Sequence, residues 1–144
     1  MKIVLYSETP EILETPSETV TKFDKSIINL VNDMFRTIDN TKAVGIAAVQ
    51  IGVLKKVLAI KDPHTGLRIA MINPEVLEQS KETNTDTEGC LSFPNKVKKI
   101  KRPNSVKVKY QNVTGKWNEV SLTQFAARIF FHEYDHINGI VCMK

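Results

Sequence analysis

The sequence predicts an α+β protein in which short antiparallel β-sheets pack around a central helix that contains the motif HExxH. Apolar residues recur every three or four positions in residues 22–40, which indicates an N-terminal amphipathic helix. Apolar and polar residues alternate in residues 106–110, which indicates a half-buried strand. A second helical pattern covers residues 123–138 and contains the motif. Because 144 residues suffice for one hydrophobic core, we expect a single domain over residues 1–144.

The first helix is expected to serve packing rather than chemistry. Its apolar residues, among them Ile27 and Leu30, lie on one helical face. Thr21 and Asp24 have the spacing of a capping box, so the helix is expected to begin directly after Thr21. No group with obvious chemistry stands on this face, and we assign it to the core.

The middle of the chain is expected to form short strands. Residues 57–60 (VLAI) and 69–72 (IAMI) are apolar runs of strand length. Residues 63–66 between them contain proline and glycine and are predicted to form a turn. The pair Asn-Pro at residues 73–74 is expected to end the second strand.

The most basic segment, residues 96–102 (KVKKIKR), is expected to be an exposed edge strand or a loop. Val97 and Ile100 interleave with the charges, and the segment has no aromatic residue that could stack on a base. The net charge of +4 permits a weak attraction to nucleic acid. A transient contact with the ribosome is therefore an alternative, whereas specific DNA binding is not expected.

The last part of the chain is expected to form a hairpin and then the helix with the HExxH motif. Strands at residues 106–110 and 117–122 flank a turn at residues 114–115. The helical pattern continues over residues 123–138, and Gly139 is a suitable C-terminal stop.

Composition limits the compartment and the partners. Hydrophobic residues make up 42% and charged residues 25% of the chain, and no apolar run approaches the ~20 residues of a membrane span. The N-terminus lacks the long apolar segment of a secretory signal. Two cysteines, far apart in such a chain, indicate reduced thiols. We therefore expect a cytoplasmic protein without a membrane partner.

The HExxH motif predicts two of the three protein ligands of a metal site. His132 and His136 are four residues apart and share one face of the predicted helix, so both imidazoles can bind one cation. Glu133 can approach a water molecule at the metal without binding the metal itself. The alternative is a chance match on a helix whose histidines are packed or solvated. His64, in the predicted turn, is expected to be an exposed loop residue.

The third ligand decides the chemistry of such a site. The eight residues after His136 contain no His, Glu or Asp, which a zinc protease would need there. Cys142 in this tail is interpreted as a buried, apolar-like cysteine. Cys90, in the sequence EGCLSFP, follows a glycine in an unusual setting for a packing cysteine. We therefore favour the Cys90 thiolate as the partner of the two histidines.

A third segment, VGIAAVQIG at residues 44–52, combines small residues with one polar side chain. Gly45, Ala47 and Ala48 permit the close approach of another backbone or of a ligand. Gln50 is either the polar member of a buried turn, satisfied by backbone groups, or a catalytic residue. The glycine spacing does not match a dinucleotide-binding or phosphate-binding loop.

Together these segments resemble the three motifs of the peptide deformylases, GxGxAAxQ, EGCLS and HExxDH. They stand in order as AVGIAAVQ (43–50), EGCLS (88–92) and HEYDH (132–136). Ala43 replaces the first glycine of the first motif, and Phe131 replaces a glutamine that commonly precedes the last. The chain stops just after this helix and so resembles a short, phage-encoded form without a C-terminal helix.

The resemblance implies an enzyme that removes the N-formyl group from the initiator methionine of nascent polypeptides, releasing formate. It implies Cys90, His132 and His136 as ligands of one divalent metal ion, Fe²⁺ in vivo, for which Zn²⁺, Ni²⁺ or Co²⁺ can substitute. A hydroxide formed from water at the metal attacks the formyl carbon, with Glu133 as general base and then general acid. The Gln50 amide and the Leu91 N–H stabilise the oxyanion.

The resemblance also implies where the substrate binds. Backbone groups near Val44, Gly45 and Gly89 are expected to pair with the peptide as an added strand. Arg128 and Asp86 stand where relatives have apolar residues. They are expected either to line the methionine pocket, as an ion pair, or to turn to solvent. In the pocket, they would alter the preference for the residue after formyl-methionine or narrow the pocket mouth.

Further expectations concern support, partners and competing functions. Asp135 is expected to pair with Arg102, as similar residues do in the family. We expect a monomer in the cytoplasm, which is the host cytoplasm if the protein is virus-encoded. One rival function is a small zinc peptidase, which predicts a third His or Glu ligand. The other is a catalytically silent metal-binding or ribosome-associated module, which predicts an incomplete set of catalytic groups.

Overall fold

The computed structural model describes residues 2–144 and forms an α+β fold with two antiparallel sheets. The helices are α1 (Pro10–Leu13), α2 (Lys25–Thr41), the 3₁₀ helix η1 (Ala48–Ile51) and α3 (Gln124–Ile137). The strands are β1 (Gly45–Ala47), β2 (Val57–Lys61), β3 (Arg68–Gln79), β4 (Thr83–Cys90), β5 (Phe93–Pro103), β6 (Ser105–Gln111) and β7 (Trp117–Thr123).

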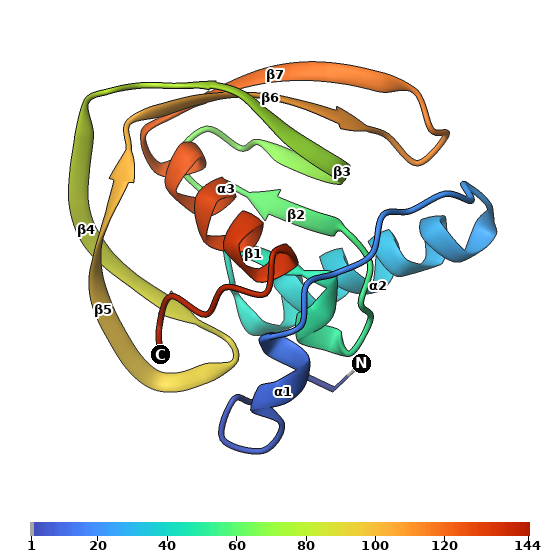
Figure 1. The fold of residues 1–144 in the computed structure, drawn as a ribbon, viewed down its shortest axis with the longest axis horizontal. Helices are drawn as coiled ribbons and strands as arrows, with labels where there is room; N and C mark the ends of the chain where they lie inside the picture. The colour runs from blue at the N-terminus through green and yellow to red at the C-terminus, as the bar shows by residue number, and fades with distance from the viewer. Residues whose placement is uncertain (1) are drawn as a thin grey trace.

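The sheets lie around α3. Strands β1, β2, β3, β6 and β7 form one five-stranded sheet in the order β1-β2-β3-β6-β7, and β4 pairs only with β5. Figure 1 shows α3 near the middle of the molecule, with the long, bent β4–β5 pair on one side and α2 on the other. We call the β4–β5 pair, residues 83–103, the arm. Among residues 2–144, no helix is both long and apolar enough to cross a membrane.

Strand β2 is buried on both faces, which explains why its sequence is apolar without alternation. Leu58 and Ile60 pack into the core around α3, whereas Val57 and Ala59 pack into a second core against α2. Side chains of neighbouring strand residues point to opposite faces, so one short strand joins both cores. The predicted strand at residues 57–60 is confirmed.

Helix α2 begins later than predicted. Asp24 is its N-cap residue, and the carboxylate of Asp24 accepts a hydrogen bond from the Ser26 N–H at 3.0 Å. Thr21 precedes this residue by three positions and caps nothing. The predicted start after Thr21 is therefore wrong, because the carboxylate itself supplies the acceptor that the first helical turn needs.

Strand β3 does not end at residues 73–74. Asn73 adopts a positive φ of 50°, and the pairing register shifts between Ile72 and Glu75. The side chain of Asn73 accepts from the Val20 N–H and donates to the Val20 carbonyl, both at 2.9 Å. This irregularity lets the strand pass through Pro74 and change its partner from β2 to β6.

The arm contains the basic segment. Residues 96–102 form part of β5 and pair only with β4, so the predicted exposed edge strand is confirmed. Val97 is 69% exposed, whereas Arg102 at the end of the segment is buried. Strand β4 was not predicted, because residues 83–87 (TNTDT) show no alternation of apolar and polar residues.

The C-terminal hairpin and the last helix agree with the sequence. Strands β6 and β7 pair with Val106 opposite Leu122, and the turn between them contains Gly115 at a φ of 86°. Helix α3 starts after Thr123, and Gly139 follows it with a φ of 74°. The helical pattern in residues 123–138 therefore correctly predicted α3, the helix that contains the HExxH motif.

Candidate active site

The HExxH helix and the end of β4 meet at the centre of the molecule. His132, Glu133 and His136 are buried side chains of α3. Cys90 is the last residue of β4, and its Sγ lies 3.3 Å from Nε2 of His136. One ligand atom each from Cys90, His132 and His136 lies within 4.8 Å of the other two. Cys90 lies 42 positions before His132 in the sequence, and the fold brings it to the two histidines.

Neighbouring groups orient one imidazole and set the protonation state of the other. The buried carboxylate of Glu88 accepts a hydrogen bond from Nδ1 of His132 at 2.7 Å, which leaves Nε2 of His132 available for a cation. Burial, together with the charges of His132 and Arg102, lowers the pKa of His136 to about 3. His136 is therefore neutral at physiological pH, which is the form that binds metals.

The residues fit a divalent metal ion. A thiol and two imidazoles are the donor types that zinc and iron sites use, and three protein ligands leave a position for water or substrate. Oε1 of Glu133 is buried and has no hydrogen-bond partner among the described residues. A buried carboxylate oxygen of this kind requires a partner, which a water molecule or a substrate in the site provides.

Burial tunes Glu133. It raises the pKa of Glu133 to about 7; the neighbouring His132 lowers this pKa, and the Glu88 charge raises it. A carboxyl group with a pKa near the working pH can both accept and release a proton. The close packing of β1 against α3 contributes to this burial, because a Cβ added to Gly45 would lie only 2.9 Å from Oε2 of Glu133.

Gln50 lies in η1. Its contacts agree in part with both alternatives from the sequence, a buried turn residue held by backbone groups and a residue of the catalytic site. Its Oε1 accepts from the Ala47 N–H at 3.0 Å, so backbone does hold the side chain. Its Nε2 donates to Ser92 Oγ at 3.2 Å and to Cys90 Sγ at 3.4 Å. The amide is therefore fixed beside the predicted metal ligand, with its donor group toward the site.

A cleft of about 370 Å³ opens beside these groups. Its walls come from the segment before η1, from the end of β4 and from α3. The predicted substrate-binding residues Val44, Gly45, Gly89 and Arg128 line it, and so does Leu91. The structure therefore gathers four of the five predicted substrate residues at one cleft.

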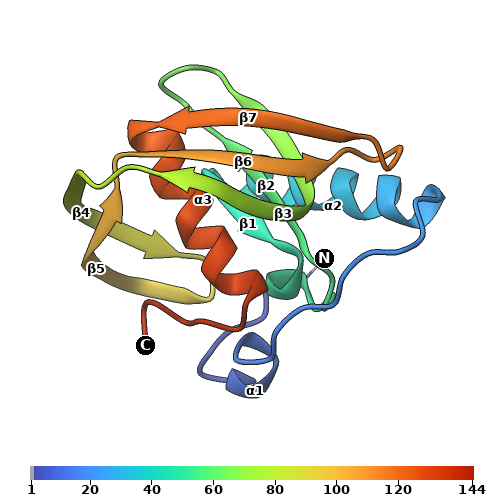
Figure 2. The same cartoon turned by 45° about the horizontal axis from the view of Figure 1, so that its top comes forward.

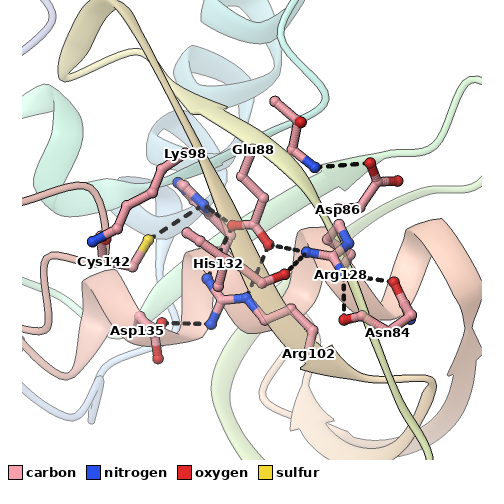
Figure 3. A network of polar contacts seen from close by, with 11 residues as sticks. Asn84, Asp86, Glu88, Lys98, Arg102, Arg128, His132, Asp135 and Cys142 are labelled. Atoms are coloured by element: carbon pink, nitrogen blue, oxygen red, sulfur yellow. Dashed lines mark hydrogen bonds and ion pairs between the residues drawn. The ribbon is translucent and has the colours of Figure 1, made fainter.

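Asp86 is the exception. It is exposed on β4, does not line the cleft, and its carboxylate accepts from the Thr87 N–H at 2.8 Å. Arg128 is buried and donates instead to Oε2 of Glu88 at 2.7 Å. The predicted Asp86–Arg128 ion pair is wrong, because the buried Glu88 lies within reach of Arg128 whereas Asp86 turns outward (Figure 3).

Glu88 is the centre of a charged network that the sequence did not predict (Figure 3). Its two oxygens accept from Nε and Nη2 of Arg102, at 2.9 Å and 3.0 Å. Arg102 also donates from Nη1 to Asp135 at 2.7 Å, which confirms the predicted Arg102–Asp135 pair. Burial disfavours ionisation of Glu88, but hydrogen bonds from His132 and Arg102 outweigh it and lower the pKa of Glu88 to about 2.

Cys142 differs from its predicted state. It is half-buried rather than buried, and its Sγ lies 3.6 Å from Nδ1 of His132. Glu88, His132 and Cys142 thus form a second group with metal-ligand spacing. The oxygens of Glu88 already bind two guanidinium groups, whose positive charges disfavour a cation there. The site at Cys90 is therefore the better candidate.

The remaining sequence expectations are simple to place. His64 is exposed in its turn, as predicted. Phe131 packs in the core beside Phe130. Ala43 lines the cleft. The two departures from the family motifs therefore remove no group from the site.

The comparison with protein families decides which family the chain belongs to. The model of the family described as polypeptide deformylase matches residues 1–144. The chain belongs to the polypeptide deformylase family. Curated relatives agree: peptide deformylase 1 of Bacillus subtilis is 44% identical over 131 residues, which cover 91% of this chain and 81% of the relative. The peptide deformylase of Thermotoga neapolitana is 42% identical over 90% of this chain and 78% of the relative.

Solved deformylase structures have the same fold. The enzyme from Ehrlichia chaffeensis matches with a TM-score of 0.93 at 35% identity, covering 98% of this chain and 84% of that one. The enzyme from Thermotoga maritima matches with a TM-score of 0.90 at 37% identity, covering 97% and 92%. The α+β, deformylase-like fold predicted from the sequence is confirmed.

The chain is thus a deformylase, a hydrolase of protein biosynthesis that removes the formyl group from nascent polypeptides. Neither rival function, the zinc peptidase or the silent module, matches this membership. These relatives are bacterial and give no support to the resemblance to a phage-encoded form.

Proposed function

We propose that deformylation takes place in the cleft between α3 and the arm, at a metal ion held by Cys90, His132 and His136. The observation that carries this proposal is the position of the Cys90 thiol beside His136, next to a buried Glu133. The thiol completes the pair of histidines that the helix alone leaves incomplete. The tail after His136 offers no equally suitable ligand, because Cys142 lies beside the network of Glu88.

The metal would be Fe²⁺ in the cell, with Zn²⁺, Ni²⁺ or Co²⁺ as substitutes. One soft thiolate and two imidazoles suit each of these ions, and the membership of a metallohydrolase family supports the choice of class. When bound, such an ion lowers the pKa of a water molecule and polarises the formyl oxygen.

Glu133 would move the proton. Its carboxylate accepts the proton of the attacking water and then delivers a proton to the amine that leaves. The pKa of about 7, raised mainly by burial, suits both halves of this transfer. The unpartnered Oε1 of Glu133 is the atom that would accept the proton.

Gln50 and Leu91 would stabilise the negative charge on the formyl oxygen. The Gln50 amide is already oriented by the Ala47 N–H and by Ser92, so little reorganisation is needed when charge develops. Leu91 follows Cys90 directly and lines the cleft, and its backbone N–H would be the second donor.

The peptide would bind as an added strand. Strand β1 is an edge of the five-stranded sheet, and β4 pairs on one side only, within the described chain. The cleft is lined by Val44 and Gly45 at the first edge and by Gly89 at the second. Free backbone groups at such edges pair readily with an extended peptide.

Arg128 would shape the pocket for the methionine side chain and narrow it. Asp86, exposed on β4, would meet only residues further along the peptide. If so, Arg128→Ile changes kcat/KM unevenly across a panel of formyl-Met-X-X peptides. Equal values for wild type and variant across the panel would contradict this role.

We further propose a monomer in the cytoplasm, with no specific DNA binding and at most a transient contact with the ribosome. Exposed lysines of β5 would make that contact. Sedimentation of the pure protein and co-sedimentation with ribosomes at increasing salt test both points. A stable dimer, or ribosome binding that resists salt, would contradict them.

The test of the site uses protein prepared without oxygen and loaded with Fe²⁺ or Ni²⁺. Formate release is measured with formyl-Met-Ala-Ser, and acetyl-Met-Ala-Ser serves as the control substrate. We expect formate from the first peptide only. Glu133→Ala is expected to abolish turnover and to retain the metal. Turnover that survives in Glu133→Ala would refute its role in proton transfer, and a loss of metal would contradict the view that Glu133 acts without holding the metal.

A further inference from the structure

The proposed metal ligands come from two parts of the fold that no shared sheet joins. Cys90 ends β4 in the two-stranded arm, whereas His132 and His136 lie on α3. Figure 2 shows the arm as a separate layer beside α3. Side-chain contacts between arm and helix must therefore set the distance between the thiol and the imidazoles.

Arg128 makes an unusually complete set of such contacts. It lies on α3, one helical turn before His132, and is 4% exposed. Its Nη1 donates to Oε2 of Glu88 at 2.7 Å and to the Ile100 carbonyl at 2.8 Å. Its Nη2 donates to the carbonyl and to Oδ1 of Asn84, at 2.9 Å and 2.6 Å. One helical side chain thus binds both strands of the arm (Figure 3).

The shape of the guanidinium group makes these contacts a rigid connection. The group is planar with donors in fixed directions, so four acceptors on two strands define its position. The acceptors hold all four terminal N–H groups, which prevents the side chain from following a substrate in the cleft. Arg128 has no part in the proton transfer proposed above, and lining the pocket does not require hydrogen bonds to both strands of the arm. These four contacts therefore need a further explanation.

We propose that Arg128 is a positioning residue that fastens the arm to α3. It thereby holds Cys90 at the distance from His132 and His136 that metal binding requires. The proposal rests on the ligand set proposed above. Through Glu88, the same contact also reaches Nδ1 of His132.

Arg128→Met is the decisive variant. Methionine keeps most of the buried volume and removes all four hydrogen bonds. Glu88 remains paired with Arg102, so the substitution leaves no uncompensated buried carboxylate and the protein is expected to fold. Arg68→Met is the matched control, because Arg68 is an exposed arginine that pairs with Asp39 on the surface.

Two quantities are measured in each variant: the rate at which bound Co²⁺ or Zn²⁺ is lost to excess chelator, and amide hydrogen exchange. Arg128→Met is expected to release metal about 10-fold faster or more, as when a group that supports a ligand is lost. Exchange is expected to rise in residues 83–103 and to stay unchanged in β2 and β3. Arg68→Met should change neither quantity. Unchanged metal release and unchanged exchange in Arg128→Met would overturn the proposal.

Arg128→Lys tests whether Arg128 acts through its fixed hydrogen bonds to both strands or only through its positive charge. Lysine restores the charge beside Glu88 but cannot bind both strands in the same fixed geometry. We expect it to recover only part of the metal retention, and full recovery would overturn the proposal. If Arg128→Met does not fold, Asn84→Ala removes one acceptor and should raise exchange in the arm in the same direction; no rise would overturn the proposal as well.

The failure of this proposal can be distinguished from failure of the proposed function. If wild type and Cys90→Ser release metal at the same rate, the ligand set is refuted. Hydrogen exchange in the arm is therefore also compared between metal-free wild type and metal-free Arg128→Met. That comparison does not involve the ligand set, so it still decides whether Arg128 fastens the arm.

Discussion

At the scale of single residues, Gly45 shows how tightly the site is built. A Cβ at this position would lie 2.6 Å from Cγ2 of Ile129 and 2.9 Å from Oε2 of Glu133. Both atoms belong to α3, which packs directly on β1 here. Close approach of another group at Gly45 was expected because the residue is small. The structure identifies what approaches, which is the carboxylate that would transfer the proton.

Gly45→Ala is therefore expected to destabilise the protein by about 1–3 kcal/mol, as overpacking does elsewhere, and to lower kcat by displacing Glu133. Urea unfolding and formate release measure the two effects. Gly89→Ala is the matched control for stability, because a Cβ there would meet no atom nearer than 4.0 Å. Equal losses of stability in the two variants would contradict the account.

Glu88 and Arg128 mark the limit of sequence reasoning at this scale. They are 40 residues apart and bond to one another, and no periodic pattern links them. The only sequence feature that pointed to Glu88 as the partner was its position directly before Gly89 and Cys90 in a polar segment. The charge partner of Arg128 was sought at Asp86, two residues too early. Which acidic residue pairs with a buried arginine depends on which acidic residue is itself buried. The sequence of β4 is polar throughout, so it does not reveal which of its side chains are buried.

At the scale of elements, helices and strands with periodic apolar residues were predicted from the sequence, whereas strands of polar sequence were not. Apolar residues three or four positions apart predicted helices α2 and α3. Apolar residues two positions apart predicted the β6–β7 hairpin. Strand β4 and the passage of β3 through Pro74 did not follow. In the second case, the side chain of Asn73 binds Val20, far away in sequence, and so compensates for a local stop signal.

The start of α2 gives a prediction for an element. Asp24→Ala is expected to lower the midpoint of thermal unfolding, because the Ser26 N–H loses its acceptor. Thr21→Ala should leave the midpoint unchanged. Hydrogen bonds from the side chain and the backbone of Ser26 lower the pKa of Asp24. The stabilisation is thus present at neutral pH and lost as the pH falls through this lowered pKa, so the two variants should converge in acid. The opposite ranking at neutral pH would restore Thr21 as the cap.

At the scale of the whole molecule, the site exists only where two layers meet. The five-stranded sheet packs against α3 through one core and against α2 through the other, and the arm brings the thiol to α3. The class of fold and the three residues proposed as ligands could be named from the sequence, because each motif is local. Their assembly was not, because it depends on contacts between the arm and α3.

This architecture predicts that the metal stabilises the whole protein. A ligand that binds only the folded state adds about 2.7 kcal/mol when its free concentration is about 100 times Kd. Removal of Zn²⁺ or Fe²⁺ with a chelator should therefore lower the unfolding midpoint, and re-addition should restore it. Mg²⁺ is the control ion, since it prefers oxygen ligands and should have no effect. An unfolding midpoint that does not change when Zn²⁺ or Fe²⁺ is removed would contradict a metal site shared by the arm and α3.

We propose that Cys90, rather than Cys142, completes the metal site of this deformylase. Metal content and formate release from formyl-Met-Ala-Ser are measured side by side in Cys90→Ala and Cys142→Ala. We predict that Cys90→Ala loses both the metal and the activity, and that Cys142→Ala retains the metal and most of the activity. The reverse pattern, or full activity in Cys90→Ala, would contradict the account.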